Sequence, residues 1–252
     1  MDTHNRHAAI LAKARINGKV EATLLARDLG VAVQTIRRDL REICATGLLE
    51  RVHGGAVLPS GVRNIAYDDR RALSRGAKQR IALRAAQLIP DNASLFLNIG
   101  TTTEAVALAL LDHRDLMVVT NNLNVANILA RNPSCEVVVA GGTLRRKDGG
   151  LVGDLAALAI ARFKVDIAVI GASAIDPSGD LLDFDPQEVR VSRQILDAAR
   201  SSILVADKSK FTRKAPVRIG SVSEVDHFVT DGAPSERFVT ACADWQTKLI
   251  LV

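Results

Sequence analysis

The segment most suited to anion chemistry is Gly-Thr-Thr-Thr at residues 100–103. It follows an apolar run at 94–99 and precedes a helical pattern. Free backbone N–H groups at a helix N-terminus, together with the helix dipole, favour a negatively charged ligand. Threonine at such a place is also an ordinary N-cap. Taken alone, these residues therefore leave anion binding and helix capping equally open.

Comparable segments follow four other apolar runs, at 120–122, 141–153, 171–176 and 207–210. In an open α/β sheet, ligands bind outside the carboxyl ends of the strands. Loops rich in Gly, Thr, Asn, Arg and Lys at that edge indicate a site for a small, polar, phosphorylated molecule. The candidate ligand-binding residues are Asn98, Gly100, Thr101, Thr102, Thr103, Asn121, Asn122, Gly141, Gly142, Arg145, Gly150, Asp183, Glu188, Lys208 and Lys210.

Charged members of this set have distinct expected roles. Arg145, Lys208 and Lys210 would supply positive charge, and Asp183 and Glu188 would accept hydrogen bonds from hydroxyl groups. Surface ion pairs explain Asp183, Glu188 and Lys210 equally well.

Residues 31–41 form a second candidate site, of a different kind. They place apolar side chains on one helical face and polar ones elsewhere, and an amphipathic segment at 20–29, ended by Gly30, precedes them. Two short helices joined by a glycine turn are typical of a helix-turn-helix DNA-binding motif. Arginine contacts phosphate or guanine, and Gln and Thr reach base edges. We therefore expect double-stranded DNA as partner, rather than a merely solvated helix face, with contacts from Gln34, Thr35, Arg37, Arg38 and Arg41.

Two β-prone runs around Gly54 and Gly55 follow the helical pattern, and they predict a hairpin, or wing. Arg51 and His53 in this wing are weaker candidates for contact with the DNA backbone or minor groove. Asp39 would not face phosphate, so we expect it to orient a neighbouring arginine.

The alternation of patterns divides the chain into a helix-turn-helix domain at 1–58, a linker at 59–76 and an α/β domain at 77–252. Seven apolar runs separated by helical patterns predict a mainly parallel sheet covered on both faces. The expected strands are 94–99, 116–120, 136–140, 166–170, 203–206, 227–230 and 248–251, and the expected helices between them are 103–111, 124–131, 155–163, 187–199 and 235–244.

Composition limits the class of protein. The chain has 252 residues and a net charge of +5, which permits nucleic-acid binding. The three cysteines, Cys44, Cys135 and Cys242, are far apart in the sequence, so we expect them to be buried, reduced thiols. The histidines have no partners at metal-binding spacing, so we expect no metal, and we expect no cofactor. We expect a cytoplasmic protein, because no apolar run approaches a membrane span and the N-terminus lacks a signal-peptide core.

The motifs at 35–40, 53–56, 100–102, 120–122, 141–142, 149–153 and 206–211, in this order, resemble the DeoR family of bacterial transcriptional regulators. The resemblance covers essentially the whole chain. It implies a winged helix-turn-helix followed by a sensor domain related to the ribose-5-phosphate isomerase and CoA-transferase fold. It further implies a repressor, commonly a homo-oligomer, that phosphorylated sugars or polyols release from its operator.

Within the family, the segments 99–111, 120–127, 145–150 and 184–190 are most similar to members that respond to glycerol 3-phosphate, which is therefore the first expected effector. Two residues depart from the family pattern. Asn98 stands where the family usually has Asp, and Ala32 stands where it usually has Ser near the start of the second helix.

The competing hypothesis is an enzyme, a phosphosugar isomerase or transferase with an accessory DNA-binding domain. Asp183 and Glu188 would be its acidic residues. Isomerisation of a sugar does not require arginines such as Arg37 and Arg38 on a helix-turn-helix. The amide of Asn98 cannot gain or lose a proton, so it cannot act as a catalytic acid or base. We therefore expect a regulator and not an enzyme, while repressor and activator remain open from the residues alone.

Overall fold

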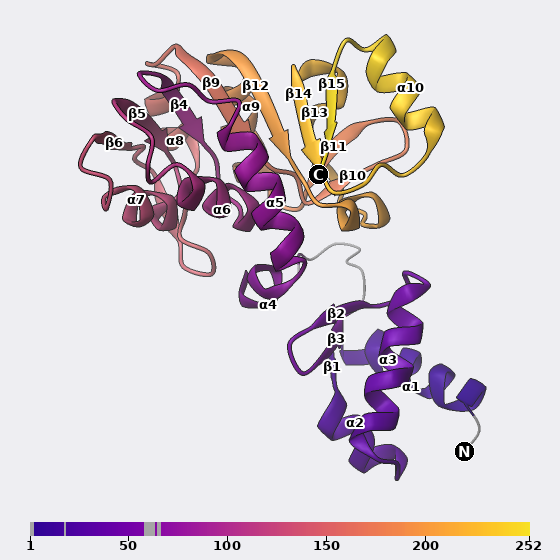
Figure 1. Ribbon diagram of the computed structural model, residues 1–252. Helices are drawn as coiled ribbons and strands as arrows, with labels where there is room; N and C mark the ends of the chain where they lie inside the picture. Colours follow the sequence, from indigo (N-terminus) through magenta and orange to yellow (C-terminus); the bar gives the residue numbers. More distant parts are fainter. Residues whose placement is uncertain (1–2, 18, 58–63, 65–66) are drawn as a thin grey trace. The chain divides into compact units, whose positions relative to one another are not determined.

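The computed structural model describes residues 3–17, 19–57, 64 and 67–252 (Figure 1). The chain forms two compact units, Met1–Leu73 and Ser74–Val252. Each unit has its own hydrophobic core.

The core of the first unit packs three of its described helices against a small antiparallel sheet of order β1-β3-β2. Its core contains Ile10, Leu25, Ile36, Leu40 and Leu49, so the 3.6-residue apolar spacing of the sequence is buried as expected. The elements are α1 (Thr3–Asn17), β1 (Lys19–Glu21), α2 (Ala22–Leu29), α3 (Val33–Ala45), β2 (Glu50–Val52), β3 (Gly55–Val57) and α4 (Tyr67–Ala72).

Glycines determine where the helices of this unit end. Gly30 has φ 65° at the end of α2, and Gly47 has φ 75° just beyond α3. This left-handed conformation ends a helix at little cost only for glycine. Ala32 is the N-cap of α3 and offers no side-chain hydrogen bond. The expected helix-turn-helix and wing are confirmed, with β2 and β3 joined around Gly54.

The segment expected to be a linker is not irregular throughout. Its described part contains α4, and α5 (Arg75–Ala86) begins before the segment ends. The acidic residues Asp68 and Asp69 stand in the first turn of α4 and Arg70 and Arg71 in its last, an arrangement that the helix dipole favours. The rest of the expected linker, residues 58–63 and 65–66, lies outside the described residues.

The second unit is built around a seven-stranded sheet of order β15-β14-β12-β9-β4-β5-β6, in which every pairing is parallel. The expected mainly parallel sheet is confirmed. Its strands are β4 (Ser94–Leu97), β5 (Leu116–Thr120), β6 (Cys135–Val139), β9 (Val165–Ile170), β12 (Ala199–Val205), β14 (His227–Thr230) and β15 (Lys248–Leu251).

Helices cover both faces of this sheet (Figure 1). On one face, apolar residues of α5, α6 (Thr101–Ala109) and α7 (Leu123–Leu129) pack with alternate strand residues such as Leu95, Leu97 and Val118. On the other, α8 (Asp154–Ile160), α9 (Pro186–Asp197) and α10 (Glu236–Asp244) pack with Phe96, Val119 and their neighbours. Because successive strand side chains point to opposite faces, the apolar runs had to be continuous.

The strand order places the candidate loops together. From β4 the chain proceeds to β5 and β6 on one side and then returns to β9, β12, β14 and β15 on the other. The direction of winding therefore reverses between β4 and β9. Ligands bind at such a switch point, outside the carboxyl ends of the strands. The loops that begin at Asn98 and Gly171 flank it.

The structure adds elements that the sequence patterns did not indicate. They are the hairpin β7 (Thr143–Arg145) and β8 (Gly150–Val152), the antiparallel sheet of β10 (Ala174–Ile175), β11 (Asp180–Asp183) and β13 (Val217–Ser221), and the short helices η1 (Lys208–Thr212) and η2 (Val222–Glu224). Strands of two to five residues carry too little periodicity to be recognised, and pairing with distant segments fixes them.

The cysteines are all free, but only Cys242 is buried. Cys44 and Cys135 are half-buried, so the expectation of three buried thiols was wrong for these two. Burial raises the pKa of each thiol. Among the described residues, we find no helix with the length and apolar character that crossing a bilayer requires.

Candidate functional site

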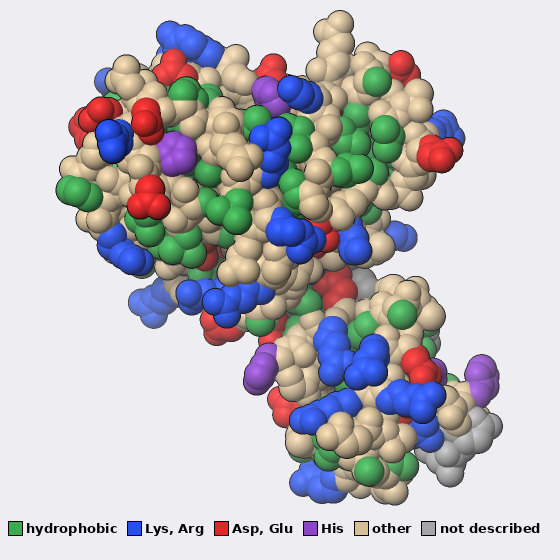
Figure 2. Space-filling model, in the orientation of Figure 1, with side chains coloured by type: hydrophobic (Ala, Val, Ile, Leu, Met, Phe, Trp, Pro, Cys, Tyr) green, Lys and Arg blue, Asp and Glu red, His purple; other side chains and the backbone are tan. Residues whose placement is uncertain are grey.

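Helix α3 presents a polar face opposite its buried one. Ile36, Leu40 and Ile43 are buried in the core of the first unit. The expected DNA-contacting residues Gln34, Arg37, Arg38 and Arg41 are exposed, and Thr35 is half-buried. Figure 2 shows Lys and Arg side chains gathered on the visible face of this unit. The helix thus offers planar cationic donors and an amide on one surface, as phosphate and base-edge contacts require.

The arginines of this face differ in how they are held. Arg38 donates from Nε to Glu42 Oε1 at 3.1 Å, one helical turn further on. Arg51 of the wing donates from Nη1 to the carbonyl oxygen of Arg37 at 3.1 Å. His53 is exposed in the turn of the wing. The wing is therefore tied to the recognition helix at the residues expected to approach the nucleic acid.

Asp39 orients an arginine as expected, but not one on its own helix. Its carboxylate, nearly inaccessible, accepts from Arg6 Nε and Nη2 on α1 at 2.5 and 2.9 Å. The Arg6 guanidinium, with a smaller contribution from His7, holds the pKa of Asp39 below its ordinary value, although burial acts in the opposite direction. A bidentate pair of this kind fixes both distance and orientation.

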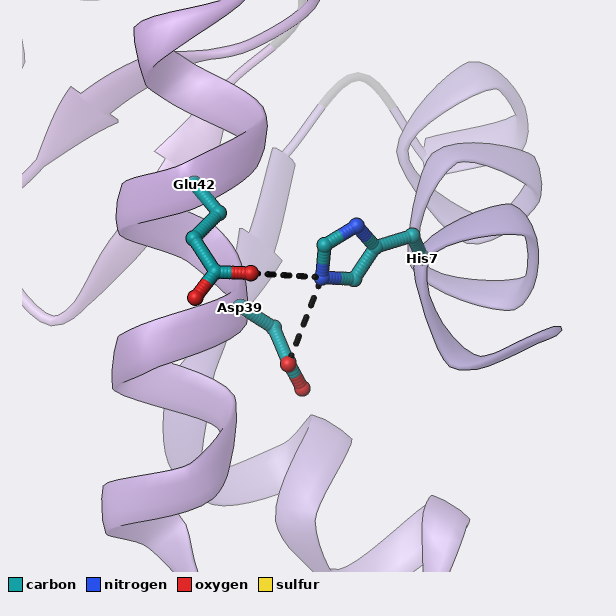
Figure 3. Close-up of side chains that lie close together, drawn as sticks. All are labelled: His7, Asp39 and Glu42. Atoms are coloured by element: carbon teal, nitrogen blue, oxygen red, sulfur yellow. Dashed lines mark hydrogen bonds and ion pairs between the residues drawn. The ribbon is translucent and has the colours of Figure 1, made fainter. Parts of the chain in front are cut away.

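His7 joins the same group of side chains (Figure 3). Its Nε2 lies 3.3 Å from Asp39 Oδ1 and 3.7 Å from Glu42 Oε2. Sequence spacing gave His7 no carboxylate partner, because these partners are more than thirty residues away and on another helix. Arginines already compensate both carboxylates, Arg6 for Asp39 and Arg38 for Glu42. The group is therefore an ion-pair network that joins α1 to α3.

At the switch point of the second unit, the candidate residues 98–103 form a tightly bonded turn. Asn98 is buried; its Nδ2 donates to Ser192 Oγ at 2.7 Å and its Oδ1 accepts from Ile99 N at 2.7 Å. Thr103 Oγ1 lies 2.7 Å from the carbonyl oxygens of both Asn98 and Gly100. Gly100 is the N-cap of α6 and has no side chain to cap it. The first N–H groups of α6 are thus left for other acceptors.

The second loop joins the first through buried amides. Asn122 caps α7 by accepting from Asn124 N and Val125 N. Glu104 Oε1 accepts from Nδ2 of both Asn122 and Asn124, at 3.4 and 3.0 Å. Asn121 donates to the carbonyl oxygen of Leu151 at 3.1 Å. Its own Oδ1 is buried and meets no hydrogen-bond donor among the described residues. It is an acceptor available to a hydroxyl group.

Glycine allows the third loop to approach the other two. A Cβ on Gly142 would lie 2.8 Å from the carbonyl oxygen of Val152, and one on Gly150 would lie 2.6 Å from Ile99 Cδ1. Gly150 also bridges to Asn122. Gly141, by contrast, is exposed and has open space around it. The structure thus brings the loops at 98–103, 120–124 and 149–151 together.

Arg145 does not supply free positive charge as the sequence suggested. Its guanidinium is paired with Asp148 at 2.8 Å, Asp185 at 2.7 Å and Glu188 at 2.5 Å. Burial would lower the pKa of Arg145, but Glu188 and Asp148 outweigh it and raise that pKa. The carboxylate of Glu188 is therefore already engaged in an ion pair with Arg145. Asp183 is buried and accepts from Ser173 Oγ at 2.7 Å and Phe184 N at 2.6 Å. These three charged side chains hold loops in place.

Three cationic side chains act instead on Asp207, directly after β12. Asp207 is buried, and burial alone would raise its pKa, yet Lys210, Ser209, Lys78 and Arg213 lower it. Lys78, Lys210 and Arg213 are thus close enough to Asp207 for their charges to act on it. Lys208 is exposed, and its backbone N–H donates to Asp231 Oδ1.

Sequence reasoning missed Lys78 and Arg213, which are both buried. Lys78 stands on α5, far along the chain from Asp207, and no nearby motif points to it. The one available signal was that Lys78 falls on the helical face of Ile81, Ala82 and Ala85, because lysine is rarely buried without an anionic partner.

Comparison with known families decides the class of protein. A model of the DeoR-like helix-turn-helix domain matches residues 6–62, and a model of the DeoR C-terminal sensor domain matches residues 74–232. The chain belongs to the DeoR family. The first match covers α3 and the wing, and the second covers the loops at the carboxyl edge of the sheet. The resemblance inferred from the sequence motifs is confirmed.

Several relatives in the family are similar over their full length. This DeoR-family chain is 46% identical over 246 residues to the glycerol-3-phosphate regulon repressor of Haemophilus influenzae, covering 98% of this chain and 96% of the relative. It is 43% identical over 251 residues to the repressor of the same name from Escherichia coli K12, covering all of both chains. A transcriptional repressor named CsqR, also from Escherichia coli K12, is 40% identical over 246 residues, which cover 98% of this chain and 94% of the relative.

Among solved structures, matches of low identity cover about half of the chain or slightly more. Ribose 5-phosphate isomerase A from Neisseria gonorrhoeae superposes with a TM-score of 0.39 at 16% identity, covering 54% of this chain and 53% of that one. The β subunit of eIF2B from Chaetomium thermophilum superposes with a TM-score of 0.45 at 17% identity, covering 61% of this chain and 48% of that one.

Proposed function

We propose that this DeoR-family protein is a transcriptional repressor that binds operator DNA through α3 and is released by a small phosphorylated polyol, glycerol 3-phosphate. The observation that carries the DNA-binding part is the exposed face of α3, with Gln34, Arg37, Arg38 and Arg41 opposite a buried apolar face. The names of the relatives, two of them glycerol-3-phosphate regulon repressors, support the effector.

The proposed effector site is the carboxyl edge of the sheet at the switch point. The phosphate would be held by the first N–H groups of α6 after Gly100, by threonine hydroxyls, and by the cationic side chains near Asp207. A hydroxyl group of the polyol would donate to Asn121 Oδ1, which is buried and without a donor among the described residues. A buried acceptor left unsatisfied costs stability, so a hydroxyl that satisfies it favours binding.

Lys78 offers a route from this site to the DNA-binding unit. It stands in the first turn of α5, and the second unit begins just before that helix, at Ser74. A bound phosphate that attracts Lys78 would weaken the electrostatic interaction between Lys78 and Asp207. A shift of Lys78 would then move the start of α5, which continues into the first unit. The coupling is a difference in effector affinity between operator-competent and released forms, roughly 1–3 kcal/mol, which weakens DNA binding roughly five- to 150-fold.

The protein is further proposed to act as a homo-oligomer. A single recognition helix reads only a few base pairs, whereas two related by a two-fold axis read half-sites one helical turn apart. Loss of that spacing on effector binding is the simplest way in which a sensor domain releases DNA.

An isomerase or transferase is disfavoured on specific grounds. The relatives are named as transcriptional repressors rather than as enzymes. Asn98 is an amide engaged with Ser192 and Ile99, and Asp183 and Glu188 are each held in structural bonds. None of these three groups is positioned as a free acid or base.

Binding of a labelled operator fragment, followed by fluorescence anisotropy, tests the proposal. Glycerol 3-phosphate is titrated in parallel with fructose 1-phosphate and ribose 5-phosphate. Release by glycerol 3-phosphate alone supports the proposal. Release by another of the three, or by none, discards the named effector and leaves DNA binding standing. Turnover of ribose 5-phosphate by the full chain would overturn the assignment as a non-enzymatic sensor.

A further inference from the structure

A hollow of about 520 Å³ lies in the second unit, and none of the residues assigned to the effector lines it. It is formed by the turn between β10 and β11, by η1, and by α10 with the segment before it. Its volume is within the range of small-molecule sites, roughly 300–1,000 Å³. The hollow also exceeds what the phosphate and short carbon chain of a polyol phosphate would fill.

Aromatic rings form the inner wall of this hollow. Phe211 and Phe238 meet edge to face with ring centroids 5.2 Å apart, and Phe238 and Trp245 do so at 5.9 Å. Trp245 packs on Gly179 so closely that a Cβ there would lie 2.6 Å from the indole. The rings are therefore fixed in place without filling the hollow. A preformed aromatic wall favours a flat, apolar ligand body.

Two of the lining residues carry charge, and their situations differ. Asp176 Oδ1 accepts from Ser178 N, Ser178 Oγ and Asp180 N at 3.0, 2.7 and 2.9 Å, so this carboxylate is committed to the turn. Arg237 is exposed, and its side chain makes no hydrogen bond or ion pair within the described part of the chain. The hollow thus combines an aromatic wall with one available guanidinium, a fork that matches a carboxylate.

We propose that this hollow is a second ligand site, separate from the effector site, that binds small aromatic carboxylates. The ring lies against Phe211, Phe238 and Trp245, and the carboxylate accepts from Arg237. The proposal does not rest on the identity of the effector, since the two sites share no residue.

The chain contains its own reporter for this site. Trp245 is the single tryptophan of the 252 residues, so every tryptophan signal comes from the wall of the hollow. Benzoate and phenylacetate are titrated into the full-length protein while the fluorescence of Trp245 is followed. The neutral amides benzamide and phenylacetamide serve as matched probes that keep the ring and lose the charge. We expect saturable changes with the carboxylates and roughly tenfold weaker binding of the amides.

Arg237→Gln should weaken carboxylate binding by about tenfold and leave amide binding unchanged, because only the charge-assisted contact is lost. Arg162→Gln is the matched control, since Arg162 is exposed on the same unit, does not line the hollow and gives the same change in net charge. Circular dichroism confirms that both variants are folded. A linear, non-saturating response of Trp245 overturns the proposal, as does an equal loss of affinity in both variants.

Discussion

Arg6 and Asp39 are thirty-three residues apart in the chain, yet their side chains form a buried bidentate ion pair that joins α1 to α3. Asp39 is buried directly after Arg37 and Arg38 in α3, two exposed residues that we propose contact DNA. His7 and Glu42 extend the network to Arg38 itself (Figure 3). The angle at which the recognition helix leaves the core is therefore set in part by α1.

Asp39→Asn should destabilise the first unit by about 3 kcal/mol or more, because it removes one charge of a buried, bidentate ion pair. Urea unfolding followed by circular dichroism measures the loss. Glu42→Gln is the control, since Glu42 is about half-exposed and its pairs should contribute roughly 1 kcal/mol or less. Equal losses in the two variants would show that burial of Asp39 does not matter.

The same pair makes the stability of the first unit depend on pH. The pKa of Asp39 is lower in the folded protein than its unfolded value of about 3.9, so the folded state binds fewer protons. The stabilisation is complete above the unfolded pKa and is lost as pH falls through the folded pKa. Unfolding of wild type should therefore become easier below about pH 5, and Asp39→Asn should show a shallower acid dependence. An identical acid dependence in both would contradict this.

Arg38→Ala should weaken operator binding and lower the slope of log affinity against log salt by about one, because one phosphate contact and its released counterion are lost. The measurement is anisotropy over a series of salt concentrations. Arg162→Ala, in the second unit, controls for net charge. A salt slope unchanged from wild type would remove Arg38 from the phosphate contacts.

Gly55→Ala should unfold or strongly destabilise the wing, because a Cβ at this position would lie 1.9 Å from the carbonyl oxygen of Val20 on β1. Separating β1 from β3 disturbs the sheet of the first unit, so we expect a loss of about 2 kcal/mol or more and weaker DNA binding. Thermal unfolding measures it. Gly141→Ala, with open space around the added Cβ, should leave stability nearly unchanged. A stable Gly55→Ala protein with normal operator affinity would argue against the described packing.

Lys78→Gln should leave operator binding intact and reduce release by glycerol 3-phosphate about tenfold or more, because a cation beside the proposed phosphate position is lost. Lys210→Gln should act in the same way. Lys248→Gln, an exposed lysine at the amino end of β15, is the control. Normal release in the Lys78 variant, with wild type responding, would make Lys78 structural; no release of wild type would instead refute the effector.

Local patterns in the sequence predicted much of the fold. The apolar spacing at Val33, Ile36, Leu40 and Ile43 predicted α3, and Gly30 and Gly47 predicted where α2 and α3 end, since periodicity and glycine conformation act over a few residues. The continuous apolar runs predicted the central strands, and through the edge rule they predicted that loops starting at Gly100, Thr120 and Gly141 share one end of the sheet.

Only the tertiary structure decided which charges pair with which. Arg145 looked like a ligand for phosphate until Asp148, Asp185 and Glu188, from two separate segments, were found around it. Lys78 was not among the candidates from the sequence, and the packing of α5 buries it where its charge acts on Asp207. The physical reason is one of range. Helix and strand patterns depend on neighbours in the chain, whereas ion pairing depends on distances of a few ångströms between segments, which only the packed chain determines.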